Sequence, residues 1–190
     1  IHLHKMIPPG AGLGGGSSDA SHALLVLNQL FALHLSDDAL RDRALQLGSD
    51  CPYFLYNRPL FAEGRGELFS EVRVNLRNYR IVLVKPPCSV STSLAYQNIK
   101  PVPAKYLLRQ EIGQDPVRWG EKISNDFETQ VFPAFPEIRL IKERMIEQGA
   151  VYASMSGSGS AVFGIFPETA GSFREEFPGL FYWEEAGKDF

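Results

Sequence analysis

The stretch PPGAGLGGGSS, residues 8–18, places five glycines in eleven positions close to the beginning of the sequence. Glycine has no Cβ, so the backbone N–H groups of such a stretch can approach a bound group that side chains would otherwise keep away. Apolar residues then follow over residues 20–31 at the spacing of one helical face, with Ser17 or Ser18 as the expected N-cap. A glycine-rich loop that leads into the positive end of a helix dipole is typical of phosphate binding.

Composition limits what the 190-residue chain can be. Its 44% hydrophobic and 22% charged residues predict a globular protein with a real core, as one domain or two small ones. A net charge of −3 without long charge runs argues against nucleic-acid binding, and no apolar stretch approaches the ~20 residues that cross a bilayer. Cys51 and Cys88 form neither a disulfide framework nor a zinc-ligand set, which favours reduced thiols in a cytoplasmic protein.

Helix and strand patterns predict an α+β fold in two parts, joined near Asn78. Ser36 and Gly48 delimit a helix over residues 37–47, and Pro136 and Gly149 delimit another over residues 136–148. Residues 50–72 are expected to form short strands and turns. Further strands are predicted at 79–85, 150–155, 161–166 and 181–186, with a mainly helical region from 88 to 148.

The residues of the glycine stretch allow three other interpretations. Gly10, Gly12 and Gly15 satisfy the G-x-G-x-x-G pattern of a dinucleotide-binding Rossmann turn, but the preceding HLHKMIPP is polar and ends in two prolines, a poor central strand. A P-loop requires a lysine after its last glycine, where this chain has Ser17. A flexible linker is disfavoured because a capped amphipathic helix follows directly.

The whole stretch resembles the second signature of the GHMP kinases, the family of galactose, homoserine, mevalonate and phosphomevalonate kinases. LGSDCPYFL (residues 47–55) with AEGRGE (62–67) is similar to the segment that carries the family's catalytic aspartate, and MSGSGSAVFG (155–164) is similar to its C-terminal glycine motif. KPPCSVSTSLAY and SNDFE follow in the expected order. The triple glycine with SSDA and the later LNQLF are most similar to the members that phosphorylate the 2-hydroxyl of cytidine-diphospho-methylerythritol in non-mevalonate isoprenoid precursor synthesis.

The resemblance implies a two-domain kinase with ATP and Mg²⁺ as cofactors and a small-molecule substrate. Residues 1–78 would belong to an N-terminal, ATP-binding α/β domain, and residues 79–190 to a ferredoxin-like α+β domain. Asp50 matches the catalytic aspartate, the base for the acceptor hydroxyl. The ATP phosphates would lie against Pro8, Pro9, Gly10, Ala11, Gly12, Leu13, Gly14, Gly15, Gly16, Ser17 and Ser18.

Substrate contacts are implied at positions near the loop and in the second domain. They are Lys5, Tyr96, Gly157, Ser158 and Gly159. Tyr96 matches an aromatic position that stacks on the cytosine ring, with a core tyrosine on a short helix as the alternative. The four histidines show no metal-ligand arrangement, so no residue is assigned to a metal.

One departure from the family pattern affects the expected activity. The family begins with a P-x-K-x-N-L motif whose lysine pairs with the catalytic aspartate, and this sequence has no such motif. We therefore expect the sequence to correspond to the C-terminal majority of such an enzyme, with an incomplete first domain that exposes an apolar face and with a rate lowered by orders of magnitude. A homoserine-type or phosphomevalonate-type kinase and a non-catalytic nucleotide-binding module stay open as alternatives.

Overall fold

The computed structural model describes residues 2–97, 99 and 106–189 and divides the chain into two compact units. The first unit comprises Ile1–Leu13 and Arg73–Phe190, and the second comprises Gly14–Val72. The chain therefore leaves the first unit inside the glycine stretch and returns to it after Val72. The boundary expected near Asn78 stays a prediction. Among the described residues, no helix combines the length and apolar character needed to span a membrane.

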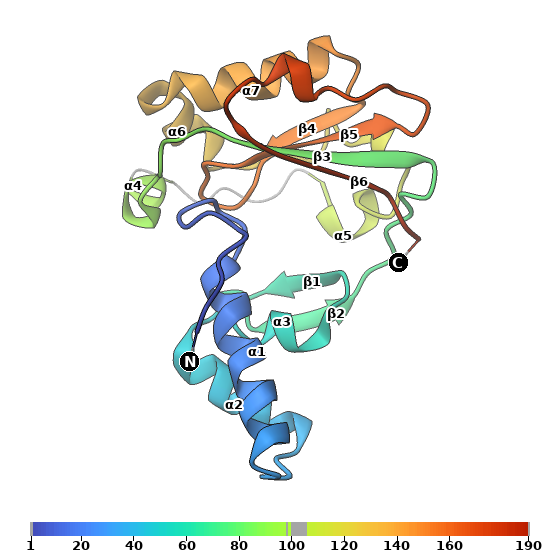
Figure 1. Cartoon of the computed structure of the whole chain (residues 1–190). Helices are drawn as coiled ribbons and strands as arrows, with labels where there is room; N and C mark the ends of the chain where they lie inside the picture. Colours follow the sequence, from blue (N-terminus) through green and yellow to red (C-terminus); the bar gives the residue numbers. More distant parts are fainter. Residues whose placement is uncertain (1, 98, 100–105, 190) are drawn as a thin grey trace. The chain divides into compact units, whose positions relative to one another are not determined.

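The second unit contains three helices and one antiparallel hairpin (Figure 1). The elements are α1 (Gly15–Leu30), α2 (Asp37–Leu47), α3 (Tyr53–Tyr56), β1 (Leu60–Glu63) and β2 (Leu68–Glu71). The prediction of α2 is confirmed, because the Ser36 side chain accepts a hydrogen bond from the Ala39 N–H and Gly48 follows the last turn. The expectation of strands and turns alone after Asp50 is wrong at α3, which is a short helix.

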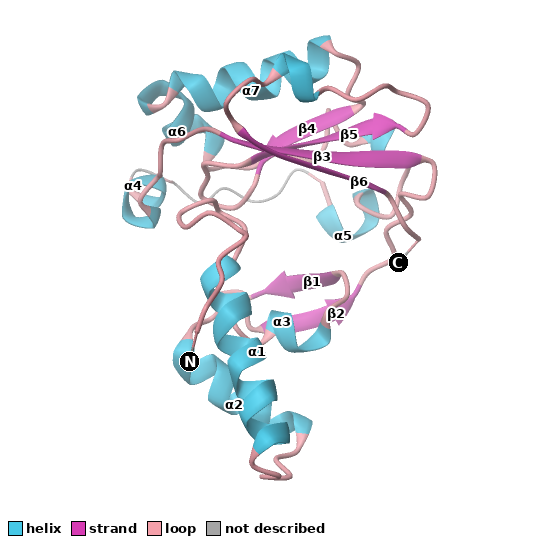
Figure 2. Ribbon diagram, in the orientation of Figure 1, coloured by secondary structure: helices cyan, strands magenta, loops and turns pink. Residues whose placement is uncertain are grey.

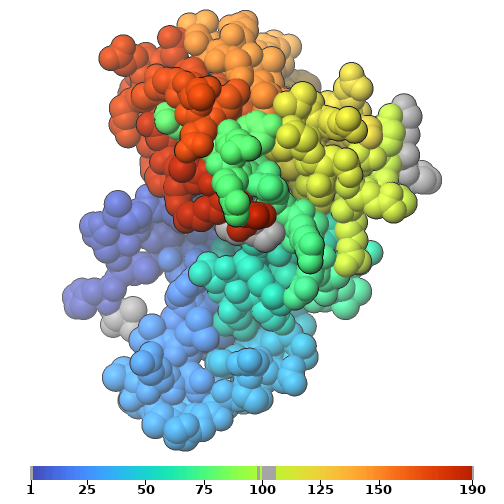
Figure 3. Space-filling view, turned by 90° about the vertical axis from the view of Figure 1, so that its right-hand side faces the viewer, coloured from blue at the N-terminus to red at the C-terminus, as the bar shows by residue number. Residues whose placement is uncertain are grey.

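The predicted start and the predicted buried face of α1 both need correction. The helix starts at Gly15, after Gly14 in the left-handed conformation, so Ser17 and Ser18 lie inside its first turn rather than capping it. Within α1, all of which the structure describes, only Ser21 is fully buried. Leu30 and the C-cap Phe31 are 70% and 64% exposed. In the space-filling view, atoms of the end of α1 and of α2 are visible at the surface, in mid to pale blue (Figure 3).

The first unit is built on a four-stranded antiparallel sheet in the order β4-β5-β3-β6. Its strands are β3 (Tyr79–Lys85), β4 (Tyr152–Met155), β5 (Val162–Pro167) and β6 (Phe181–Ala186). The helices are α4 (Thr92–Tyr96), α5 (Leu108–Glu111), α6 (Glu128–Ala134) and α7 (Pro136–Glu147), with 3-10 turns at Pro116–Arg118 and Arg174–Glu176. Figure 2 shows α7 lying across one face of the sheet.

The core of the first unit lies between α7 and the sheet. Ile138 and Met145 from α7 are fully buried, and they join Val82, Val84 and Phe166 from the strands in one apolar cluster. Full burial of one such side chain stabilises a fold by about 1.5–3 kcal/mol. The IVLV run of β3 forms a central strand because both of its neighbours pair with it, as the near-continuous apolar sequence predicts. The α+β fold class is confirmed.

Candidate active site

The first half of the glycine stretch packs against the loop that joins β4 to β5. The Ser156 hydroxyl donates to the Gly12 carbonyl over 2.8 Å, and the Ala161 N–H donates to the Ala11 carbonyl over 2.9 Å. Gly12 has a φ of +72°, and a Cβ there would overlap the backbone of Ser156 and Gly159. Only glycine fits this position, so two stretches that are 144 residues apart in sequence form one backbone surface.

Asn125, which the sequence reasoning did not select, holds the same loop from another side. Its Nδ2 donates to the carbonyls of Met155 and Gly157, both over 2.8 Å, while its Oδ1 accepts from the Phe127 N–H over 3.0 Å. The SNDFE segment was noted in the sequence only for its order along the chain. An asparagine with partners about 30 residues away leaves no periodic signal that would reveal this role.

A cavity of about 480 Å³ lies beside this loop in the first unit. Tyr96 and Gly157, two of the predicted substrate residues, both line it. Tyr96 is 62% exposed, which excludes the core role, and its ring meets that of Phe127 edge-on with 4.7 Å between the centroids. The other lining residues are Ile99, Ile123, Ser124, Asn125, Asp126, Phe127, Tyr152 and Ser154. Burial raises the pKa of the Tyr152 hydroxyl above its ordinary value.

The second half of the glycine stretch forms the N-terminus of α1 in the second unit. Its first helical hydrogen bond runs from the Ser18 N–H to the Gly14 carbonyl over 2.8 Å, so the earlier N–H groups have no partner within the helix. No acidic residue lies in the first turn. A Cβ added at Gly16 would meet nothing within 4 Å. This helix end is open, lacks an acidic side chain in its first turn and can accept an anion.

Asp50 is exposed in the turn between α2 and α3, also in the second unit. Its Oδ1 would lie 3.5 Å from a Cβ on Gly66, which places the carboxylate beside the β1–β2 turn. The buried Ser21 hydroxyl of α1 donates a hydrogen bond to the carbonyl of Cys51, the residue after Asp50, over 2.6 Å. This bond fixes the Asp50 turn to the second turn of α1. The approach of Asp50 to Gly66 makes the LGSDCPYFL and AEGRGE segments neighbours in space.

Three of the predicted substrate residues do not line the 480 Å³ cavity. Lys5 is exposed and does not line the 480 Å³ cavity, and Ser158 is half-buried in the β4–β5 loop. The Rossmann interpretation is wrong, because the described residues 2–14 form no strand ahead of the glycines. Cys51 and Cys88 are both free thiols.

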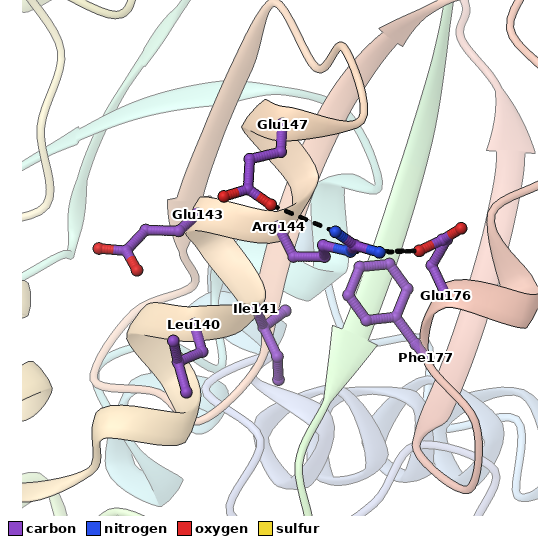
Figure 4. A pocket seen from close by; sticks show the side chains of 7 residues that line it. All are labelled: Leu140, Ile141, Glu143, Arg144, Glu147, Glu176 and Phe177. Carbon is purple, nitrogen blue, oxygen red and sulfur yellow. Dashed lines mark hydrogen bonds and ion pairs between the residues drawn. The ribbon is translucent and has the colours of Figure 1, made fainter.

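A second surface cavity, of about 350 Å³, lies on α7 and contains none of the predicted residues (Figure 4). Arg144 is its central polar group. Its guanidinium bonds to Glu176 over 2.5 Å and to Glu147 over 3.3 Å, contacts that raise the pKa of the arginine. Because two carboxylates already engage this cation, we do not assign a ligand to the cavity.

Comparison with models of known protein families shows to which family this chain belongs. The model "GHMP kinases N terminal domain" matches residues 1–58, and "GHMP kinases C terminal" matches residues 104–182. The chain belongs to the GHMP kinase family. The resemblance drawn from the glycine motifs is thereby confirmed.

Two curated relatives show which kind of GHMP kinase this chain is similar to. A protein from Bacteroides thetaiotaomicron named 4-diphosphocytidyl-2-C-methyl-D-erythritol kinase is 50% identical over 175 residues, which cover 92% of this chain and 64% of the relative. One of the same name from Bacteroides fragilis is 46% identical, covering 97% of this chain and 67% of the relative. The chain thus spans about two thirds of the length of these relatives.

Solved structures of GHMP kinases also resemble the fold of this chain. A crystal structure of 4-(cytidine 5'-diphospho)-2C-methyl-D-erythritol kinase superposes with a TM-score of 0.75 at 33% identity, covering 97% of this chain and 68% of that protein. A homoserine kinase from Cytophaga hutchinsonii gives a TM-score of 0.74 at 17% identity, covering 97% and 69%. The second match shows a shared fold only.

Proposed function

We propose that this chain supports ATP-dependent phosphorylation of the 2-hydroxyl of 4-diphosphocytidyl-2-C-methyl-D-erythritol. The observation that carries the phosphoryl-transfer part is the second unit, where Ser21 ties the Asp50 turn to α1, the helix with an open N-terminus. The substrate part rests on the relatives of that name at 46% and 50% identity over nearly the whole chain.

Phosphoryl transfer requires that the transferred group be held and its charge spread, with little covalent help from the protein. The N–H groups of Gly15, Gly16 and Ser17 point along the axis of α1, where the helix dipole adds roughly half a positive charge. These residues fit a nucleotide phosphate. The Ser17 and Ser18 hydroxyls are further donors, and each can also serve as a ligand to a metal ion that the phosphates bring.

Magnesium is proposed as part of the nucleotide substrate rather than as a resident ion. Among the residues that the structure describes, no group of three His, Cys, Asp or Glu side chains is placed to hold a metal. Mg²⁺ commonly keeps several waters and binds through phosphates with only one or two protein ligands. A donor set of hydroxyls near the helix end therefore fits a Mg²⁺ that arrives with ATP, which supplies charge neutralisation on the phosphates.

Asp50 is proposed as the group that accepts the proton of the acceptor hydroxyl. An exposed carboxylate beside a glycine turn is accessible to a substrate, and the Ser21 bond to the neighbouring carbonyl limits movement of the turn. General-base help of this kind contributes typically about 10²–10⁴-fold in rate.

The cytidine end of the substrate is proposed to bind in the cavity of the first unit. Its volume falls within the usual ~300–1,000 Å³ for small-molecule sites. The exposed ring of Tyr96 offers a stacking surface for a base, and Gly157 lines the same cavity. An aromatic cavity of this kind has no evident use for homoserine, a small amino acid, which favours the cytidine substrate over that alternative.

The proposed function is tested by ADP release from the full-length gene product with Mg²⁺, ATP and each candidate alcohol. Turnover is expected with 4-diphosphocytidyl-2-C-methyl-D-erythritol and not with homoserine or phosphomevalonate. Asp50→Asn should lower kcat by about 100-fold or more while ATP binding stays unchanged. Asp42→Asn, the same change on an exposed helix position, should have no effect. An Asp50→Asn enzyme with wild-type turnover would disprove the role of Asp50, and no turnover with the cytidine substrate would disprove the function.

A further inference from the structure

Asp126, in the turn just before α6, is an exposed residue that lines the 480 Å³ cavity. Of the lining residues that the structure describes, it is the only Asp, Glu, Lys or Arg. We propose that Asp126 is a specificity residue that selects cytosine over uracil by accepting a hydrogen bond from the amino group of the base. The inference rests on the proposed function and deepens it, because it states which atom of the substrate the cavity recognises.

The position of a stacked base relative to Asp126 follows from the aromatic pair in the cavity. The exposed Tyr96 ring meets the Phe127 ring edge-on, with 4.7 Å between the centroids. Phe127 is the residue after Asp126, and both line the cavity together with Tyr96. Stacking uses the face of a base and leaves its polar edge available for hydrogen bonds. A base on Tyr96 therefore lies next to the turn that carries Asp126 and can direct its polar edge toward the carboxylate.

The carboxylate of Asp126 is available to a ligand. In the part of the chain that the structure describes, no hydrogen bond or ion pair engages its oxygens. The backbone carbonyl of the same residue accepts a hydrogen bond from the Thr129 hydroxyl over 2.8 Å, so the turn is held while the side chain stays free. An ionised carboxylate is an acceptor only, and it therefore favours a ligand group that carries hydrogen.

Most of the other polar side chains of the cavity have already donated their hydrogens within the protein. The Asn125 NH₂ group donates to two backbone carbonyls, both over 2.8 Å. The Ser154 hydroxyl donates to Glu128 Oε1 over 3.2 Å, and the Tyr152 hydroxyl donates to a backbone carbonyl over 3.4 Å. Among the described lining side chains, only the Ser124 hydroxyl has no such acceptor. The side chains of the cavity thus offer mainly acceptors to a ligand.

Cytosine and uracil differ in the group that they present to acceptors. Cytosine has an amino group with two N–H donors, where uracil has a carbonyl oxygen that only accepts. A carboxylate attracts the amino group and repels the carbonyl oxygen. The N3–H of uracil lies between two carbonyl groups, so it meets a carboxylate only by bringing those oxygens close as well. One specific contact to a base edge discriminates against the wrong base by about 5- to 150-fold.

The test uses the full-length gene product with 4-diphosphocytidyl-2-C-methyl-D-erythritol and with the analogue that carries uracil in place of cytosine. Wild type should have a kcat/KM that is about tenfold or more higher for the cytidine substrate. In Asp126→Asn, an NH₂ group can donate to the uracil carbonyl, so the ratio of the two kcat/KM values should fall by about tenfold or more. A merely structural role for Asp126 would lower both kcat/KM values equally and leave their ratio unchanged.

Thr129→Val is the matched control, because it removes a hydrogen bond of the same turn and keeps the carboxylate. Its ratio of kcat/KM values should equal that of wild type. Asp126→Ala is a second variant at an exposed position and should bring the ratio close to one.

The outcomes separate this inference from the proposed function. Equal kcat/KM values of wild type for the two substrates, or an unchanged ratio in either Asp126 variant, would overturn this inference alone. Absence of wild-type turnover with the cytidine substrate would overturn the proposed function, and the inference with it.

Discussion

Replacing Gly12 by alanine should separate the first half of the glycine stretch from the β4–β5 loop. A Cβ at this position would lie 2.7 Å from the Gly159 carbonyl oxygen and 2.9 Å from its nitrogen, in addition to an overlap with the Ser156 carbonyl. These are backbone atoms of another segment, so no side-chain rotation relieves the overlap. The φ of +72° is a second obstacle, because alanine rarely adopts it.

The size of the effect can be worked from these contacts. The left-handed conformation costs about 1–2 kcal/mol for a residue with a Cβ. Displacement of residue 12 also weakens the Ser156–Gly12 and Ala161–Ala11 hydrogen bonds, each worth about 0.5–1.5 kcal/mol. The free energy of unfolding should therefore fall by about 2–5 kcal/mol. With a urea dependence of about 2 kcal/mol per M, the unfolding midpoint should fall by about 1–2.5 M.

Urea unfolding followed by circular dichroism measures this change, with Gly16→Ala as the matched control. Gly16 lies in the same stretch, but it is helical and a Cβ there meets nothing within 4 Å. Alanine at this position should stabilise the protein by about 0.5–1 kcal/mol, the usual gain over glycine in a helix. Equal midpoints for Gly12→Ala and wild type would refute the packing argument, since the two obstacles at Gly12 could not then be present together.

Three further outcomes are expected. Gly16→Ala should weaken ATP binding by about tenfold or more in isothermal titration although it stabilises the fold, because its methyl group would occupy the open helix end; unchanged ATP affinity would argue against phosphate binding there. Lys85→Met should lower the free energy of unfolding by about 1–2 kcal/mol, since the buried Lys85 ammonium donates to two carbonyls of residues 86–88, whereas Lys188→Met on the surface should be neutral in the same urea titration. Burial and the hydrogen bond to Asp115 raise the pKa of Tyr79 to about 12, so the stability from this pair is complete below pH 10 and is lost as the pH rises from 10 to 12. The difference in absorbance at 295 nm between wild type and Tyr79→Phe should titrate near pH 12, and a midpoint near 10 would contradict the contact.

The sequence predicted best those elements whose ends are set by local chemistry. α2 lies between Ser36 and Gly48, and α7 starts with Pro136, because caps and proline act on the residues beside them. The sequence did not predict elements whose structure depends on contacts with residues distant in the chain. The aromatic run Tyr53–Tyr56 has the composition of a strand but forms a helical turn, in which the Phe54 ring packs where a side chain on Gly14 would lie.

The residues of the candidate site differ in the same way: some are recognisable from local sequence, and others only from distant contacts. Asp50, Tyr96 and Gly157 could be selected because each belongs to a motif that is recognisable as a string of residues. Asn125 could not, because its two carbonyl partners come from β4 and the loop after it, and nothing in a single sequence reports that pairing. Its role became visible only from hydrogen-bond geometry.

The glycines of the opening stretch serve different purposes, which a motif cannot distinguish. Gly12 is required by packing, since a side chain would strike backbone in the same unit. Gly14 is required by conformation and by the Phe54 ring, since its φ is +63° directly before α1. Gly16 meets neither requirement: it is helical, where alanine is more stable, and nothing surrounds it. A glycine that the fold does not need, at an open helix end, agrees with the proposed phosphate site, because a ligand there would need the space.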